Sequence, residues 1–491
     1  MRRIQTPTTR LAAAMLLAVG AVACANAATI TITTRDAANV GFNDPTPVAP
    51  VGGNPGTTLG AQRLFVYQYV ANIWGAALNS PVNITVSAGW EALTCTATTA
   101  VLGSAGAWNL WHDFAGGVPG TWYHQALANK LAGTNLSAGV PDDGTGYGNV
   151  DIKTQFNVNL GAANCLAGSS FYLGVDGNAG SNVNFVATLL HELGHGLGFS
   201  VLTSNSTGNR ISPITGNYVA TGGLPAVWET YLQDNTTGKT WLAMSNAERQ
   251  ASAINPLALA WTGSQAVAGA ASTLSNLPQL KLTSPAPGLS GFYNYGTASA
   301  IGPSATNLGN FGKLAFGGNG LGCTAAGGVP ASVAGRVAVI SRGTCSFAEK
   351  AKNAQLAGAV GVIIANNQAG GAISLGGADA SVTIPTVSVS QVDGARILAG
   401  IETAMKYGTR TTPGSVSSSL TSDPTRRAGS DALGRPLMNT PSVLAAGSSV
   451  SHWDPSAFPN LLMEPAINSD LTILLVPPKD ITLPLLKDIG W

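Results

Sequence analysis

The sequence predicts a mixed α/β protein that carries a second, smaller α/β domain within its chain. Residues 28 to about 200 alternate helical and strand patterns, which is typical of one mixed α/β unit. Residues from about 286 to 410 follow the order strand, helix, strand, strand, helix, which indicates a separate small α/β domain. The chain has 491 residues, of which 45% are hydrophobic, so it can build more than one sizeable core.

Three helices and one strand are expected in the first unit. Thr57 or Thr58 can cap a helix with apolar positions from Leu59 to Leu78, and residues 82–86 then alternate as a strand. A second helix is expected over residues 123–131. A third covers residues 185–197, where one apolar stripe faces the core, formed by Val186, Leu189, Leu190, Leu193 and Leu197.

The remaining segments give weaker patterns. We expect a turn at residues 235–238 and a helix over 241–260. In the smaller domain, strands are expected at 336–340, 360–365 and 384–389. Ser346 and Glu349 form a capping-box pattern that opens a helix to about residue 358, and a last helix there runs from 390 through 401. Residues 480–491 are expected to close the fold as a helix.

The composition and the N-terminal residues indicate an exported protein. A net charge of +1 with 10% charged residues provides no basic surface, which argues against nucleic acid and anionic membranes as partners. Three arginines precede the apolar stretch 11–25, and Ala25-Asn26-Ala27 offers a cleavage site, so residues 1–27 are expected to be a signal peptide. Lipoprotein anchoring at Cys24 is a minor alternative. No later segment has 18 uninterrupted apolar residues, so we expect no stable membrane insertion.

Four cysteines remain after the signal peptide, and an even number in an oxidising compartment predicts two disulfides. Three pairings are possible. The domain division favours Cys95 with Cys165 and Cys323 with Cys345, because each pair then lies within one folding unit.

The residues with most chemical content are His191-Glu192-Leu193-Gly194-His195, an HExxH pattern. On a helix this spacing places two imidazoles on one face with a carboxylate beside the first, which is typical of zinc hydrolases. With five histidines in the chain, chance placement would give the pattern about once in a thousand such sequences. Gly194, Gly196 and Gly198 are poor interior helix formers, so we expect metal ligation to hold this turn and Gly198 to end the helix.

The third zinc ligand is not at the nearest expected place. A catalytic zinc usually has three protein ligands, and the compact motif HExxHxxGxxH would place a third histidine at 195 + 6 = 201, which is Val201. His452 is one candidate, and Glu229 or Asp234 would supply a carboxylate instead. His112 and His124 are flanked by aromatic residues and are expected to be structural.

Two resemblances bear on this choice. The run GRVAVISRGTCSFAEKAKNAQLAGAVGVIIANN at 335–367 resembles the protease-associated (PA) domain, which has no catalytic residues of its own and is thought to contact substrates or gate access. In that family Cys323 and Cys345 would correspond to a bridge. The run Ser451-His452-Trp453 is followed eleven positions on (463 − 452) by Met463. With the HExxHxxGF run, this resembles leishmanolysin-type metzincins.

The metzincin resemblance implies a role for each matched residue. His191, His195 and His452 would bind Zn²⁺, Glu192 would be the general base, and Met463 would form the Met-turn beneath the metal. The peptidase domain would then lie in two segments, 28–285 and 413–491, separated by a PA domain at 286–412.

The expected function is a secreted zinc endopeptidase that acts on proteins or peptides. The alternative from another class is a non-catalytic exported protein that binds through its PA domain and has a structural or degenerate zinc site. A calcium site at Asp142-Asp143 or Asp176 is also open, although loop carboxylates are usually just solvated. The sequence indicates neither an oligomeric state nor a cleavage preference.

Overall fold

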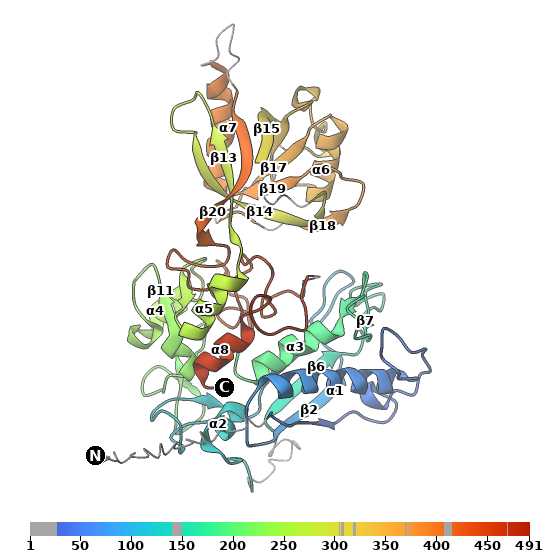
Figure 1. The fold of residues 1–491 in the computed structure, drawn as a ribbon, viewed down its shortest axis with the longest axis vertical. Helices are drawn as coiled ribbons and strands as arrows, with labels where there is room; N and C mark the ends of the chain where they lie inside the picture. Colours follow the sequence, from blue (N-terminus) through green and yellow to red (C-terminus); the bar gives the residue numbers. More distant parts are fainter. Residues whose placement is uncertain are drawn as a thin grey trace, which may run out of the picture.

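A computed structural model describes residues 27–139, 150–303, 305, 309–317, 321–368, 371–373, 375–406, 415–468 and 470–491. The chain forms a larger lower unit and a smaller upper unit, and β13 (Asn276–Thr283) and β20 (Ser417–Arg427) lie where the two meet (Figure 1). The predicted signal peptide, apart from residue 27, and the alternative lipid site Cys24 lie outside the described residues, as does the pair Asp142-Asp143.

The larger unit is built on a four-stranded sheet in the order β1-β2-β6-β3. Strands β1 (Ile30–Thr34), β2 (Ile84–Glu91) and β6 (Ile152–Asn157) are parallel, and β3 (Gly103–Ala107) is the antiparallel edge. Three helices accompany it: α1 (Leu59–Ala77), α2 (Gln125–Ala132) and α3 (Phe185–Gly196). Of the two predicted cap candidates, Thr58 caps α1, its side chain accepting a hydrogen bond from the Ala61 N–H.

The larger unit has one hydrophobic core, formed by residues that precede and residues that follow the smaller unit in the sequence. Buried side chains between residues 28 and 274 pack in the same cluster as others between 438 and 489. Helix α8 (Thr482–Ile489) buries Leu483, Leu486 and Ile489 in this core, which confirms the predicted closing helix. The two sequence segments therefore form one folded body.

The rest of the larger unit is made of short elements. The strand pairs are β4 (Leu110–Trp111) with β5 (Tyr123–His124), β7 (Phe171–Tyr172) with β8 (Val183–Asn184), β9 (Arg210–Ile211) with β10 (Tyr218–Val219), and β11 (Leu232–Asp234) with β12 (Leu259–Trp261). The helices are η1 (Gly41–Asn43), η2 (Val227–Tyr231), η3 (Trp241–Ala243), α4 (Asn246–Ser252) and α5 (Ser264–Thr273).

The predicted helix over 241–260 is wrong. Only α4 is α-helical there, and strand β12 begins before the predicted end. Ser245 opens α4 with a complete capping box, so the helix starts late. Pro256 disfavours helical geometry in the residue before it, and Leu257 adopts a positive φ of 61°, so the helix cannot continue.

The smaller unit is an eight-stranded mixed sheet in the order β13-β20-β15-β16-β17-β19-β14-β18, with β13 also paired to β14. The additional strands are β14 (Gly291–Ile301), β15 (Gly309–Phe316), β16 (Val337–Ser341), β17 (Gly361–Ala365), β18 (Leu375–Asp379) and β19 (Thr386–Val389). Helices α6 (Phe347–Leu356), α7 (Gln391–Lys406), η4 (Thr324–Ala326) and η5 (Ala331–Val333) complete it. The sheet reaches beyond the expected domain limits of 286 and 412 at both ends.

Helix α6 shows how far the capping prediction holds. The Ser346 side chain accepts a hydrogen bond from the Glu349 N–H, as expected. The Glu349 carboxylate, however, accepts from the Thr324 N–H at 2.9 Å, so it ties η4 to α6 instead of completing the box. One half of the box is therefore used for a tertiary contact.

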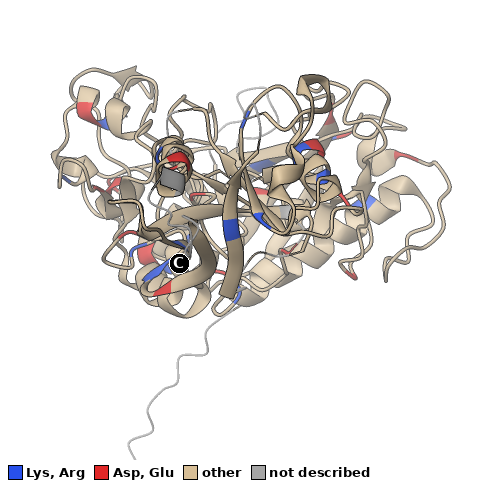
Figure 2. Cartoon of the chain, turned by 90° about the horizontal axis from the view of Figure 1, so that it is seen from above, with Lys and Arg blue, Asp and Glu red and all other residues tan. Residues whose placement is uncertain are grey.

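Charged residues are sparse in both units. Figure 2 shows Lys, Arg, Asp and Glu positions scattered singly along the ribbon, with most of the chain uncharged. Within the part of the chain that is described, no helix is long and apolar enough to cross a bilayer.

Candidate metal centre

Helix α3 carries the HExxH residues, and its dense packing fixes their direction. The Asn184 side chain caps the helix, accepting from the Ala187 N–H at 3.2 Å. The indole N–H of Trp74 in α1 donates to the Leu190 carbonyl. The predicted apolar stripe is buried throughout. Gly198 has a φ of 117° and follows the helix end, as expected from its sequence position.

Three imidazoles converge at this helix. The Nε2 atom of His195 lies 3.1 Å from that of His191 and 3.2 Å from that of His452, and the third Nε2–Nε2 distance is 3.3 Å. Among the described residues, these form the one group of three or more potential metal-ligating side chains close enough to hold an ion. The structure thus brings together three histidines that are up to 261 positions apart in sequence.

Backbone carbonyls determine the protonation pattern of these rings. The Nδ1 atom of His191 faces the Leu462 carbonyl at 2.7 Å, that of His195 faces Phe199, and that of His452 faces Ser448. A carbonyl only accepts, so each ring carries its proton on Nδ1 and leaves Nε2 as a lone pair. No pattern of residue types marks these carbonyls, so sequence reasoning could not identify them.

This donor set fits a tetrahedral divalent cation. Three lone pairs pointing at one another within 3.3 Å repel unless a positive charge lies between them. Zinc–nitrogen distances of about 2.0–2.1 Å at tetrahedral angles place ligand nitrogens about 3.3–3.4 Å apart. The observed separations come close to that spacing.

Burial keeps the three imidazoles neutral. It lowers the pKa of His191 to about 4 and that of His452 to about 3, and it places the pKa of His195 well below its ordinary value. Because the charged form is disfavoured, the lone pairs are available near neutral pH. Neutral imidazoles are the form that binds metals.

Glu192 lies beside the first histidine and is buried. Burial raises the pKa of its carboxyl to about 8, and a backbone hydrogen bond with Ala105 in β3 partly opposes the increase. A divalent cation nearby would favour the carboxylate and lower this pKa. Binding of a cation would therefore shift this group toward the carboxylate, the form in which it can accept a proton.

Met463 packs so closely against the motif helix that Gly194 has no room for a side chain unless Met463 shifts. A Cβ on Gly194 would lie 2.8 Å from the Met463 Sδ atom, and a Cβ on Gly196 would lie 2.4 Å from Cγ2 of Ile152 in β6. Both glycines therefore permit close packing of α3. Close packing of α3 is thus one reason for these glycines, and the expected stabilisation of the turn by a metal stays a prediction.

Glu229 makes a different set of contacts from a metal ligand. Its carboxylate accepts two hydrogen bonds from Arg210, of 2.9 and 2.7 Å, and one from the Thr203 hydroxyl. It is fully buried and forms an ion pair with Arg210. The other carboxylate candidate, Asp234, accepts from Ser252 and Thr237. Neither belongs to the histidine group.

The other singled-out side chains also have local partners. His112 pairs with Asp113 and packs against Trp122. His124 is buried, and its Nε2 lies 2.7 Å from the Ser200 hydroxyl. Asp176 is exposed and accepts hydrogen bonds from Tyr172 and Asn178.

Both predicted disulfides are present. Cys95 is bonded to Cys165, and Cys323 to Cys345, so the pairing expected from the domain division is confirmed.

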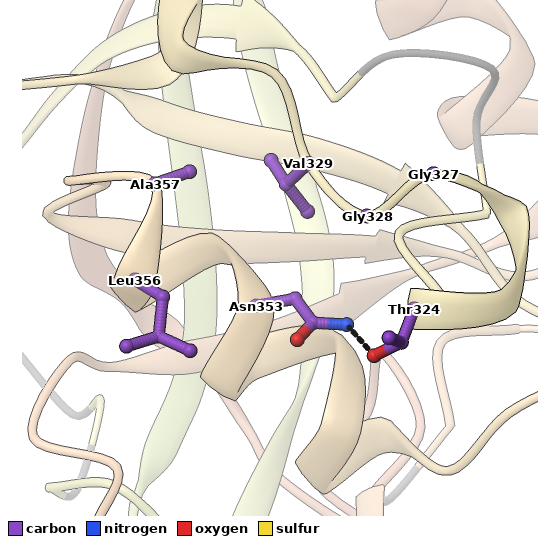
Figure 3. Close-up of a pocket in the computed structure, with 7 residues that line it drawn as sticks. All are labelled: Thr324, Gly327, Gly328, Val329, Asn353, Leu356 and Ala357. Atoms are coloured by element: carbon purple, nitrogen blue, oxygen red, sulfur yellow. Dashed lines mark hydrogen bonds between the residues drawn. The ribbon is translucent and has the colours of Figure 1, made fainter.

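A shallow depression of about 490 Å³ lies on the smaller unit, between η4 and α6. Figure 3 shows Thr324 and Asn353 joined by a hydrogen bond across it, with Val329, Leu356 and Ala357 on its apolar side. None of the metal-centre histidines lines it.

Comparison with known proteins identifies part of the chain. Residues 310–397 match the PA domain family. A stretch of 68 residues, 14% of this chain, is 34% identical to the minor extracellular protease Vpr of Bacillus subtilis and spans 8% of that protein.

Solved structures overlap with part of the chain. A zinc aminopeptidase from Bacillus subtilis covers 32% of this chain and 36% of its own, at 25% identity and a TM-score of 0.21. An aminopeptidase from Aneurinibacillus sp. covers the same shares at 24% identity and a TM-score of 0.20. The chain thus spans about a third of either structure, and overlaps this small do not bear on the larger unit. The chain contains a PA domain, and any activity has to be argued from its own site.

Proposed function

We propose that this protein is a secreted zinc endopeptidase of the leishmanolysin-like metzincin type. The peptidase domain would comprise residues 28–285 and 413–491, with the PA domain at 286–412 between them and a signal peptide at 1–27. The observation that carries the proposal is the convergence of three Nε2 lone pairs beside a buried glutamate. Two disulfides are consistent with an oxidising, extracellular environment.

Each residue of the centre has a proposed role. His191, His195 and His452 would hold the zinc, and Met463 packs against Gly194 of the motif helix. Zinc held there would supply Lewis-acid chemistry, lowering the pKa of a water to about 7 and polarising the scissile carbonyl. Glu192 would carry the proton, accepting it at its carboxylate and donating it to the leaving amine. Burial around Glu192 limits competing hydrogen bonds from solvent.

Strand β3 is the proposed place for the substrate backbone. It is the edge of its sheet, it lies against α3, and the backbone of Ala105 bonds the Glu192 carboxylate. An extended peptide added to this edge would pass beside the general base. The strand is open at Gly106, where an added Cβ would meet nothing within 4 Å.

Glu192→Gln tests the proposal. The amide keeps the shape of the carboxyl but cannot accept a proton, so the variant should bind zinc as the wild type does while casein hydrolysis falls at least about a hundredfold. Equal inactivity of both proteins on a panel of unfolded substrates would favour the alternative, a binding protein that acts through its PA domain.

The third ligand is tested by a matched pair of variants. His452→Ala should lose most of its zinc and its activity, because one of three ligands is gone. Glu229→Ala should retain the zinc ligands and lose stability instead, because the partly buried Arg210 guanidinium loses its partner. Retained zinc and full activity in His452→Ala would contradict the metzincin assignment.

A further inference from the structure

The third histidine reaches the metal centre from a distant part of the chain. His452 lies 257 positions after His195 (452 − 195), on the far side of the PA domain. Its position must therefore be set by contacts between the two segments of the larger unit. Three such contacts join residues 199–205, directly after the HExxH helix, to residues 449–453.

Two of these contacts are hydrogen bonds to Ser449 and Ser451, the residues on either side of Val450. The backbone N–H of Val201 donates to the Ser451 hydroxyl at 3.1 Å, and the Asn205 side-chain amide donates to the Ser449 carbonyl at 2.6 Å. The third is an edge-to-face contact between the rings of Phe199 and Trp453, with centroids 5.2 Å apart. Val201 is the position at which the compact motif would carry its third histidine.

The residue between Ser449 and Ser451 has an unfavourable backbone conformation. Val450 is fully buried and has a φ of 65°, a left-handed value that a β-branched side chain rarely adopts. Its N–H donates to the Asn439 carbonyl, and the Asn439 N–H donates to the His452 carbonyl, both at 2.8 Å. Such a conformation persists only where its surroundings hold it on several sides.

We infer that Asn205 and Ser451 are positioning residues for His452. They hold the strained turn 448–452 against the loop that follows the HExxH helix, so that the His452 Nε2 meets the other two. The inference rests on the proposed function, in which His452 of this turn is a zinc ligand. Ser451 is buried. The Asn205 side chain acts through its amide N–H, and its buried Oδ1 has no hydrogen-bond partner among the described residues.

The test measures zinc binding of the full chain by competition with a chromophoric chelator. Asn205→Ala and Ser451→Ala should each weaken zinc binding about ten- to hundredfold, as is typical when a residue that orients a ligand is removed. Asn353→Ala is the matched control, because this amide also donates to a backbone carbonyl, that of Gly322, but in the PA domain. It should bind zinc as tightly as the wild type.

Two further readouts separate positioning from general destabilisation. Absorption of the cobalt-substituted protein should change in Asn205→Ala and Ser451→Ala but not in Asn353→Ala, because it reports the ligand geometry. In a Val450→Gly background, which tolerates a positive φ, Asn205→Ala should cost a smaller factor in zinc affinity. Equal losses in both backgrounds would indicate a merely structural role and overturn the inference.

The outcomes distinguish this inference from the proposed function. If the wild type binds zinc and the Asn205→Ala and Ser451→Ala variants have the same zinc affinity, the inference alone is overturned. A wild-type protein that binds no zinc would overturn the proposed function, and the inference with it.

Discussion

Gly196→Ala should destabilise the protein even though alanine favours helices. The added Cβ would lie 2.4 Å from Cγ2 of Ile152 and within 3.0 Å of two further atoms of the same side chain. Ordinary contacts begin at 3.4 Å, so the overlap is 3.4 − 2.4 = 1.0 Å. Ile152 is buried in β6, and its branched side chain has little rotamer freedom. Helix α3 must therefore move away from the sheet.

The magnitude follows from two opposing effects. Overpacking of a tight site costs about 2–3 kcal/mol, and replacing glycine at the last residue of α3 returns at most about 1 kcal/mol. The net loss should be about 1–2 kcal/mol in the free energy of unfolding, measured by urea denaturation of the metal-free protein. Gly194→Ala is the control, because its nearest neighbour is the flexible Met463 side chain, and it should cost less.

Either of two results would refute this reasoning. The first is a Gly196→Ala protein as stable as the wild type. Ile152→Ala removes all three crowding atoms, so in this background Gly196→Ala should cost much less free energy of unfolding than in the wild type. The second refuting result is therefore a double-mutant cycle in which the two costs simply add.

Three further predictions concern stability. Burial raises the pKa of Glu464 to about 8 from an ordinary 4.5, so its proton is held more tightly in the folded state and its contribution to stability is lost as pH rises between those values. Glu464→Gln should therefore gain stability relative to the wild type between pH 5 and pH 8 in urea denaturation; a constant difference would contradict this. Asp488→Ala should lower the free energy of unfolding by about 2–3 kcal/mol, because the Asp488 carboxylate accepts hydrogen bonds from two N–H groups at the start of α5 and from the Trp261 indole. An unfolding midpoint in calorimetry equal to that of the wild type would exclude this role. Replacing Cys323 and Cys345 by serine should cost about 3 kcal/mol, since the bridge closes a loop with a separation of 22; an unchanged unfolding transition of the PA domain would be the contrary result.

Local patterns predicted those elements whose determinants are close in sequence. The cap at Thr58, the apolar stripe of α3 and the inward face of α8 depend on residues within one or two turns, and the structure has them where they were expected. The helix expected over 241–260 failed because Pro256 and Leu257 interrupt a run of otherwise helical composition. Helix α7 likewise continues to Lys406, beyond the expected end at residue 401.

The candidate site divides in the same way. HExxH is local, so the sequence alone placed His191 and His195 on one helix face, with Glu192 beside the first. His452 could be suggested only through the spacing to Met463. Its position depends on contacts between the two segments of the larger unit, which are far apart in the sequence. The carbonyls of Leu462, Phe199 and Ser448, which set the imidazole tautomers, have no side-chain signature. The strain at Val450 is likewise visible only in three dimensions.

The most direct test of the central claim is anomalous scattering at the zinc absorption edge from crystals of the full chain. We expect one strong peak about 2.0–2.1 Å from the Nε2 atoms of His191, His195 and His452, with the fourth position open to water. A peak bound by only two of these histidines, or a zinc held at Glu229, would contradict it.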